Sequence, residues 1–191
     1  MPDKPVYQAT TYFMQVIKTS IEGLIELRPQ TFKDSRGSFL ETYNQPVFQG
    51  LGLPAHFVQD NQSFSTKGVL RGLHFQNAPF AQGKLVRVIT GKVLDIAVDL
   101  RVGSPTFGKY ESFILDSELS NMAYIPEGFA HGFVALEDSI FSYKCTNVYN
   151  KSCESGIIWN DPDLNINWGV DNPTVSDKDQ QLSRFRELYP Q

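Results

Sequence analysis

Short runs of apolar or β-branched residues alternate with clusters of turn-forming residues along most of the chain. Several runs place apolar and polar residues at alternate positions, which is typical of a strand with one buried face. Gly, Pro, Asp and Ser clusters such as Asp34–Gly37 and Pro126–Gly128 separate the runs. We predict about eleven strands, at residues 24–27, 38–43, 56–61, 69–76, 84–90, 93–100, 110–115, 122–125, 132–136, 140–148 and 156–159.

A helical pattern occurs at only two places. After Ser176, a residue type that caps helices, Leu182, Phe185 and Leu188 recur at three-residue steps, so we predict a helix near the C-terminus. A brief helical turn is predicted at residues 45–49. Strands that follow one another without intervening helices favour an antiparallel sandwich or small barrel over a parallel βαβ sheet. The predicted fold class is therefore all-β.

Length and composition predict one folded domain. The chain has 191 residues, close to the roughly 150 that one domain typically contains. Apolar residues make up 41% and charged residues 20%, which is ordinary for a globular protein. Residues 1–13 show neither strand alternation nor a helical period. We therefore expect an N-terminal extension at residues 1–13 and a single domain at residues 14–191 that includes the C-terminal helical segment.

The charge balance limits the partners of the protein. Seventeen basic and twenty-one acidic residues give a net charge of −4, which argues against general binding of nucleic acid or of an anionic membrane. An anionic ligand would need a local cluster of Lys and Arg. No apolar stretch reaches the ~20 residues of a membrane helix. With Cys145 and Cys153 as its only cysteines and no secretory signal, the chain is expected in the cytoplasm with both thiols reduced.

Two of the three histidines lie in recognisable motifs. His74 ends Gly68-Val-Leu-Arg-Gly-Leu-His74, and His131 ends Pro126-Glu-Gly-Phe-Ala-His131. These spacings resemble the two halves of the cupin jelly-roll motif, in which both histidines point into the mouth of the barrel. Metal-binding cupins continue the first half as H-x-H, whereas Phe75 and Gln76 follow His74 here. Two histidines and a glutamine make a poor divalent site, so we predict no metal and histidines that are free to move protons.

Other polar residues near these motifs have ordinary interpretations when taken singly. Lys84 opens an apolar strand and could be a solvated strand end, while Tyr143 and Tyr149 lie six residues apart on one strand and could be aromatic packing. Arg71 precedes His74 by three residues, which would place the two side chains on opposite faces of a regular strand. A bulge at Gly72 would turn both toward one cavity.

Six successive blocks of the chain resemble one family over residues 14–179, nearly the whole domain. The blocks are FKDSRGSFLETYN, FVQDNQSFSTKGVLRGLHFQ, QGKLVRVITGKVLDIAVDLRVGSPTFGKY, YIPEGFAHGFVAL, YKCTNVYNKSCESGIIWNDPDLNINW and NPTVSDKD. Their order and spacing are similar to those of the dTDP-4-dehydrorhamnose 3,5-epimerases. The resemblance implies a cupin-type jelly roll, an antiparallel β-sandwich or barrel with a short C-terminal helix, that works without a cofactor or a metal.

The resemblance also implies a reaction. The family's substrate, dTDP-4-dehydro-6-deoxy-D-glucose, has acidic protons at C3 and C5 because both carbons flank the C4 ketone, and inverting each centre requires a base and an acid. By this resemblance His74 is the base, Asp179 orients it, Lys84 stabilises the oxyanion at C4 and Tyr143 is the acid. The product would be dTDP-4-dehydro-L-rhamnose.

The same resemblance implies binding roles and an assembly. The expected substrate contacts are Arg36, Glu41, Gln59, Asp60, Asn61, Arg71, His131, Tyr149, Glu154 and Lys178, with the Tyr149 ring stacked on thymine. Asp95, on the strand after Lys84, is expected to be a partner of that lysine. Relatives are dimers that exchange edge strands, so we expect a homodimer.

Three alternatives remain open. The first is a single-centre epimerase, acting at C3 only or at C5 only on a related nucleotide-linked 4-keto-6-deoxy sugar. The second is a metal-dependent cupin oxygenase, which would lose its activity on chelation. The third is a module that binds sugar nucleotides without catalysis and therefore leaves the carbon-bound hydrogens of its ligand in place.

Overall fold

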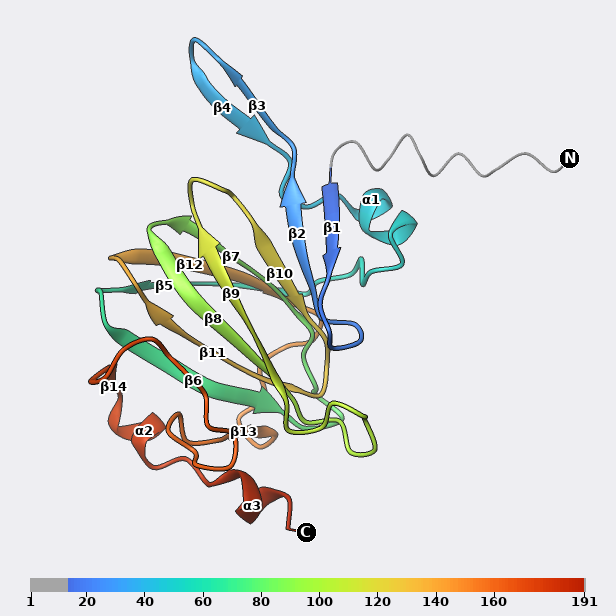
Figure 1. The fold of residues 1–191 in the computed structure, drawn as a ribbon. Helices are drawn as coiled ribbons and strands as arrows, with labels where there is room; N and C mark the ends of the chain where they lie inside the picture. The colour runs from blue at the N-terminus through green and yellow to red at the C-terminus, as the bar shows by residue number, and fades with distance from the viewer. Residues whose placement is uncertain (1–13, 191) are drawn as a thin grey trace, which may run out of the picture.

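Two packed antiparallel sheets form the body of the molecule in the computed structural model, which describes residues 14–190 (Figure 1). In spatial order the first sheet contains β1 (Met14–Lys18), β2 (Ile25–Pro29), β10 (Met122–Ile125), β7 (Lys84–Thr90), β12 (Ser139–Cys145) and β5 (Gln59–Ser65). The second contains β13 (Glu154–Gly156), β6 (Val69–Gln76), β11 (Phe129–Ala135), β8 (Lys92–Asp99) and β9 (Tyr110–Asp116), with β14 (Thr174–Val175) parallel to β6. The predicted all-β fold is confirmed. The predicted extension, residues 1–13, lies outside the described residues.

Strand alternation directs one set of side chains into the space between the sheets. On β8, Val93 and Ala97 point inward and join the core between the two sheets. Ile96 and Val98 point to the other face, which the C-terminal segment covers. Because both faces of this sheet are buried, its central strands are apolar at nearly every position.

The C-terminal segment is less helical than predicted. It contains two four-residue helices, α2 (Asp177–Gln180) and α3 (Phe185–Leu188), separated by a β-bridge between Ser183 and Ile157. Ser176 caps α2 by accepting a hydrogen bond from the backbone N–H of Asp179 at 3.1 Å. The predicted C-terminal helix is thus present as two short helices along the outer face of the second sheet. The result is that α2 lies against β6 (Figure 1).

The outer face of the first sheet is only partly covered. Helix α1 (Gln45–Gly50) lies at the predicted helical turn and packs Val47 and Phe48 over Leu27, Leu85 and Met122. None of the helices within residues 14–190 has the length and apolar character needed to cross a membrane.

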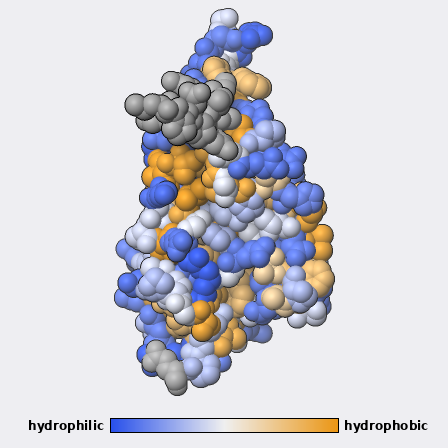
Figure 2. All heavy atoms as spheres, turned by 90° about the vertical axis from the view of Figure 1, so that its right-hand side faces the viewer, coloured by the Kyte–Doolittle hydropathy of each residue, from blue (hydrophilic) through white to orange (hydrophobic). Residues whose placement is uncertain are grey.

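A separate two-stranded hairpin, β3 (Thr31–Asp34) and β4 (Gly37–Leu40), extends away from the two sheets (Figure 1). Its side chains are mostly exposed, and Phe39 is 70% exposed. On the side that carries β1 and α1, apolar side chains gather below the hairpin (Figure 2). The strand pattern missed β3 because its residues, Thr-Phe-Lys-Asp, lack a buried face.

Candidate active site

A cavity of about 490 Å³ lies between the two sheets. Its wall includes His74, Lys84, His131, Tyr143 and Asp179, five residues that come from β6, β7, β11, β12 and α2. A neighbouring hollow of about 350 Å³ shares three of these side chains. The other residues that line this second hollow are Gln59, Asn61, Phe75, Gln76, Gln82 and Tyr149. The three shared residues, His74, Lys84 and Tyr143, therefore lie where the two spaces meet.

A bulge in β6 brings Arg71 and His74 to the same side of the sheet. The register against β11 changes between these two residues, so β6 contains one extra residue at the predicted position. Gly72 has a φ of +122°, and a Cβ atom there would lie 2.6 Å from the Cα atom of Gly132. Only glycine fits this close approach between strands. Arg71 and His74 consequently both line the cavity.

His74 is paired with a buried carboxylate. Its Nε2 lies 2.7 Å from Oδ1 of Asp179, and Oδ2 of Asp179 accepts a hydrogen bond from the backbone N–H of Gly72 at 3.1 Å. Burial alone would raise the pKa of Asp179, but these hydrogen bonds and the charge of His74 outweigh burial and lower it. The carboxylate therefore accepts the proton of Nε2 and leaves the other ring nitrogen of His74 as the basic atom.

Lys84 and Tyr143 face each other within the same space. The Lys84 Nζ lies 6.0 Å from the centroid of the Tyr143 ring, and that ring packs against Phe141 at 6.1 Å. Burial raises the pKa of the Tyr143 phenol, which keeps it protonated at neutral pH. Burial lowers the pKa of Lys84, whereas the charges of Cys145, Asp95 and Glu154 oppose that shift. The site thus contains a protonated phenol and a lysine amino group beside the imidazole.

His131 forms a second imidazole–carboxylate pair. It lies opposite His74 in the register of β6 and β11, is only 7% exposed, and its Nε2 lies 2.7 Å from Oδ1 of Asp95. The hydrogen bond of Asp95 therefore goes to His131, and its link to Lys84 is electrostatic. The prediction that Asp95 is a partner of Lys84 therefore holds through charge, and the hydrogen bond to His131 is a contact that the sequence did not predict. Sequence spacing could not reveal the pair because the two residues lie on different strands.

The second hollow carries a polar network at its rim. The Tyr149 hydroxyl donates to Oε2 of Glu154 at 3.0 Å, and Lys178 Nζ lies 2.8 Å from Oε1 of Glu154. The backbone N–H of Tyr149 donates to Gln59, whose side-chain amide donates to Asn61. The Tyr149 side chain remains 53% exposed. An aromatic ring is thus held at the surface beside a cation and two amides.

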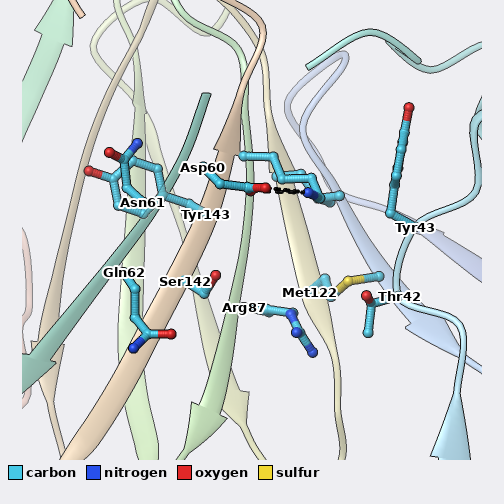
Figure 3. A pocket seen from close by; sticks show the side chains of 11 residues that line it. Thr42, Tyr43, Asp60, Asn61, Gln62, Arg87, Met122, Ser142 and Tyr143 are labelled. Carbon is cyan, nitrogen blue, oxygen red and sulfur yellow. Dashed lines mark hydrogen bonds and ion pairs between the residues drawn. The ribbon is translucent and has the colours of Figure 1, made fainter. Parts of the chain in front are cut away.

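The Asp60 side chain points away from the central cavity. Successive side chains of a strand point to opposite faces, and Figure 3 shows Asn61 and Tyr143 pointing to one side while Asp60 points to the other. Asp60 makes an ion pair with Lys144 at 2.8 Å in a hollow on the outer side of the sheet, which Arg87 also lines. Within one chain the Asp60 side chain therefore lies apart from the central cavity, and its predicted contact with substrate stays a prediction.

Arg36 and Glu41 are also placed apart from the cavity within one chain. Arg36 lies at the turn of the projecting hairpin, where its guanidinium pairs with Asp34 at 2.6 Å and its side chain is 88% exposed. Glu41, just after the hairpin, accepts a hydrogen bond from Asn44 at 3.1 Å. Within one chain, Arg36 and Glu41, like the Asp60 side chain, therefore lie apart from the other predicted site residues.

Sequence reasoning missed an apolar wall of the cavity. Phe133 and Phe141 stack with ring centroids 4.2 Å apart and line the cavity with Leu70. Alternation could have identified Phe141, since it lies two residues before Tyr143 on the same strand. Within the described part of the chain, no group of three or more His, Cys, Asp or Glu side chains is arranged to hold a metal ion. The cavity thus combines an apolar wall with groups that transfer protons.

Comparisons with known proteins agree with this geometry. A protein-family model described as dTDP-4-dehydrorhamnose 3,5-epimerase matches residues 18–187. A relative with that name from Shigella flexneri is 52% identical, covering 90% of this chain and 96% of its own. The crystal structure of the Elizabethkingia anophelis 3,5-epimerase has a TM-score of 0.88 at 46% identity and covers 92% of this chain and 98% of its own. A Legionella pneumophila 3,5-epimerase in complex with dTDP-4-keto-L-rhamnose has a TM-score of 0.86 at 44% identity, with coverages of 90% and 92%.

Proposed function

The chain belongs to the dTDP-4-dehydrorhamnose 3,5-epimerase family, and from this premise we propose that it inverts C3 and C5 of dTDP-4-dehydro-6-deoxy-D-glucose to give dTDP-4-dehydro-L-rhamnose. One observation carries the proposal. The His74–Asp179 pair, with 2.7 Å between Nε2 and Oδ1, shares one cavity with Lys84 and the Tyr143 phenol. A base, a cation and an acid are the groups that inversion next to a ketone requires.

Each inversion proceeds in two proton transfers. The free ring nitrogen of His74 removes the proton from the carbon next to the ketone, and the electron pair moves to the C4 oxygen, where the Lys84 ammonium stabilises the enolate. Tyr143 then gives its proton to the opposite face of that carbon, and the C4 carbonyl re-forms. His74 is left protonated and Tyr143 ionised, and exchange with solvent restores both groups before the second centre reacts.

The rim of the second hollow suits the nucleotide. The exposed ring of Tyr149 supports stacking on thymine, and Lys178 with Arg71 supplies positive charge for the diphosphate on a protein of net charge −4. Gln59 and Asn61 offer amide groups toward the same space. This arrangement supports placing the nucleotide in the second hollow and the sugar in the central cavity.

We also propose a homodimer in which the hairpin of each chain reaches the site of the other. The exposed Phe39 on the hairpin, and Phe64 and Ile89 on the outer face of the first sheet, are 70%, 60% and 41% exposed. A second copy of the chain would bury such apolar surface. The arrangement would also bring Arg36 to the partner's cavity.

Both cysteines are free thiols, which supports a reducing compartment such as the cytoplasm.

Mixing two inactive variants tests this assembly. Arg36→Ala and His74→Ala should each be inactive alone, because each removes a different part of every site. If the hairpins are exchanged, a heterodimer has one intact site, and mixing should restore about a quarter of the wild-type activity. A mixture that stays inactive although sedimentation shows heterodimers would refute the exchange.

Turnover in heavy water tests the reaction itself. Each inverted carbon acquires a proton that has exchanged with solvent, so the product should carry deuterium at both C3 and C5 in its NMR spectrum. Deuterium at only one of these carbons would identify a single-centre epimerase. Binding of the nucleotide sugar without deuterium at either carbon would identify a non-catalytic module.

A further inference from the structure

Asp95 is a buried carboxylate with one oxygen left unpaired. It is fully buried on the inward face of β8, and its Oδ1 interacts with His131. Its Oδ2 is the one buried side-chain oxygen or nitrogen between residues 14 and 190 that has no hydrogen-bond partner. Buried polar atoms are nearly always paired, because an unpaired one costs free energy. Such an atom behind the cavity wall calls for a functional explanation.

Lys84 lies on the opposite sheet and points into the same interior space. Val86 and Val88 follow it on β7 and belong to the core between the sheets, so alternation directs Lys84 inward toward the face that carries Asp95 and His131. The titratable groups around Lys84 come from six elements: Arg71 and His74 on β6, Asp95 on β8, His131 on β11, Tyr143 and Cys145 on β12, Glu154 on β13, and Lys178 and Asp179 on α2. Three of them are carboxylates: Glu154 is already bound to Lys178 and Asp179 to His74, whereas Asp95 has an unpaired oxygen.

We propose that Asp95, acting from behind the cavity wall, is a positioning residue that fixes the tautomer of His131 and supplies the negative charge that keeps Lys84 an ammonium group. This inference rests on the proposed epimerase function, because it assigns Lys84 the task of stabilising the enolate. Asp95 does not line the cavity and acts only through the two side chains in front of it.

The first part of this role concerns His131. Burial lowers the pKa of this imidazole, and the charges of Lys84 and His74 lower it further against the pull of Asp95. The ring is therefore neutral at neutral pH, and a carboxylate 2.7 Å from Nε2 requires the proton on that nitrogen. The other nitrogen is left as a hydrogen-bond acceptor next to His74. A neutral acceptor there avoids a second positive charge beside the base.

The second part concerns Lys84. Burial favours its neutral amine form, which could not stabilise an oxyanion, and Asp95 is among the charges that oppose this effect. The unpaired Oδ2 gives Asp95 a lone pair that is not committed to any other donor. Removing this charge should lower the pKa of Lys84 and with it the pH above which the enzyme loses activity.

Asp95→Asn tests the role with almost no change in size. We expect kcat to fall at least tenfold with KM changed less than threefold, and the basic limb of the kcat–pH profile to move to lower pH. Asp99→Asn is the matched control, because Asp99 is buried on the same face of the same strand; Ser104→Ala, which removes one donor to Asp99, is a milder second control. Both controls should leave the position of the basic limb unchanged. If Asp95→Asn leaves it unchanged as well, Asp95 does not act on Lys84.

A double variant separates this role from a purely structural one. If Asp95 acts through Lys84, then adding Asp95→Asn to Lys84→Met should lower kcat by less than threefold beyond the single lysine variant. Multiplication of the two single effects would overturn the proposed action of Asp95 on Lys84, and the state of the His131 ring tests the other part.

The resting protein provides a readout that needs no substrate. The ¹⁵N shifts of the His131 ring should report a proton on Nε2 in the wild type and a mixture of tautomers in Asp95→Asn. A His131 ring with its proton on the other nitrogen in the wild type would refute the tautomer assignment even if epimerisation is observed. Failure of the wild type to turn over the sugar nucleotide, with the tautomer as expected, would instead refute the proposed function.

Discussion

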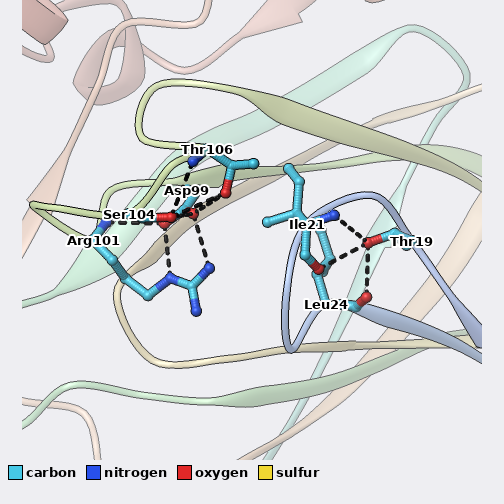
Figure 4. A network of polar contacts seen from close by, with 7 residues as sticks. All are labelled: Thr19, Ile21, Leu24, Asp99, Arg101, Ser104 and Thr106. Atoms are coloured by element: carbon cyan, nitrogen blue, oxygen red, sulfur yellow. Dashed lines mark hydrogen bonds and ion pairs between the residues drawn. The ribbon is translucent and has the colours of Figure 1, made fainter.

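Asp95 and Asp99 share a strand, a face and complete burial, yet their surroundings differ. Asp99 accepts hydrogen bonds from Nε, Nη2 and the backbone N–H of Arg101 at 2.9, 2.8 and 3.0 Å, and from the hydroxyls of Ser104 and Thr106 at 2.6 Å each (Figure 4). Thr19 makes a smaller network of turn hydrogen bonds nearby. Asp95, in contrast, has His131 as its hydrogen-bond partner and one oxygen without any.

The difference shows how one residue type serves either the fold or the site. Burial alone would raise the pKa of Asp99, but the hydrogen bonds from Arg101, Ser104 and Thr106 hold it far below its usual range. The Arg101 guanidinium also lies 4.7 Å from the centroid of the Phe129 ring, so the network ties the β8–β9 loop to β11. A carboxylate with all its lone pairs satisfied stabilises the structure. A carboxylate with an unpaired oxygen, such as Asp95, can instead influence a neighbouring charge such as that of Lys84.

The largest effect is expected from replacing Asp179, the carboxylate paired with His74 in the cavity, and it contrasts with the effect of replacing Asp99. Asp179→Asn keeps the size of the side chain but removes the charge that orients His74 and stabilises it when protonated. We expect kcat to fall by about 10²–10⁴-fold, with nucleotide affinity within about tenfold and a melting temperature that falls less than that of Asp99→Asn. Steady-state kinetics, calorimetric titration with dTDP and thermal unfolding measure the three quantities. A protein that loses binding and folding together would show that Asp179 is mainly structural.

The converse variant, Asp99→Asn, should act on stability and leave chemistry intact. It replaces an acceptor of five hydrogen bonds with an amide that can accept only part of them, so we expect the free energy of unfolding to fall by about 2–3 kcal/mol. Denaturant unfolding measures the loss. The kcat of the folded variant should stay within about twofold, and a larger fall would mean that the Asp99 network also shapes the cavity.

The pH dependence of protein stability below pH 7 tests the role of Asp99 in the fold. The pKa of Asp99 is lowered in the folded protein from an ordinary value of 3.8, so its contribution is complete above that value and is lost as pH falls toward the folded pKa. The stability difference between the wild type and Asp99→Asn should therefore be constant from pH 7 to about pH 5 and shrink below pH 4. A difference that instead grows as pH falls would contradict the sign of the shift.

The smallest expected effects come from two neighbours on β5. Asn61→Ala removes an inward amide and should raise KM by about tenfold, equivalent to about 1.4 kcal/mol. Asp60→Ala removes an outward ion pair with Lys144, which should change stability by less than about 1 kcal/mol and leave KM unchanged. Equal effects of the two variants on KM would contradict the placement of these residues on opposite faces.

Much of the fold follows from alternation, but the C-terminal segment and the hairpin do not. The strands with a buried face, such as β6 to β9, coincide with predicted runs because one or both of their faces must be apolar. Leu182 and Phe185 recur with helical spacing, yet tertiary packing on the second sheet divides the segment into α2 and α3. The contacts that interrupt the helix are tertiary, so the local spacing of apolar residues cannot predict them.

The candidate site shows a similar division. A motif locates His74, the resemblance to the family adds Lys84, Tyr143 and Asp179, and the structure brings these four residues to one cavity. Alternation also predicts that the Asp60 side chain faces away from those of Gln59 and Asn61, as the structure shows. The pairing of Asp95 with His131 depends on the register and side-chain packing of β8 and β11, which residue types alone do not determine.

The most direct test of whether base and acid lie on opposite sides of the sugar uses two variants, Tyr143→Phe and His74→Ala. For each, the exchange of substrate protons with heavy water is measured together with the formation of inverted product. Tyr143→Phe retains the base, so it should exchange the protons next to the ketone with solvent while forming no inverted product. His74→Ala should show neither exchange nor inversion. Exchange that persists in His74→Ala but disappears in Tyr143→Phe would contradict the assignment of the two groups.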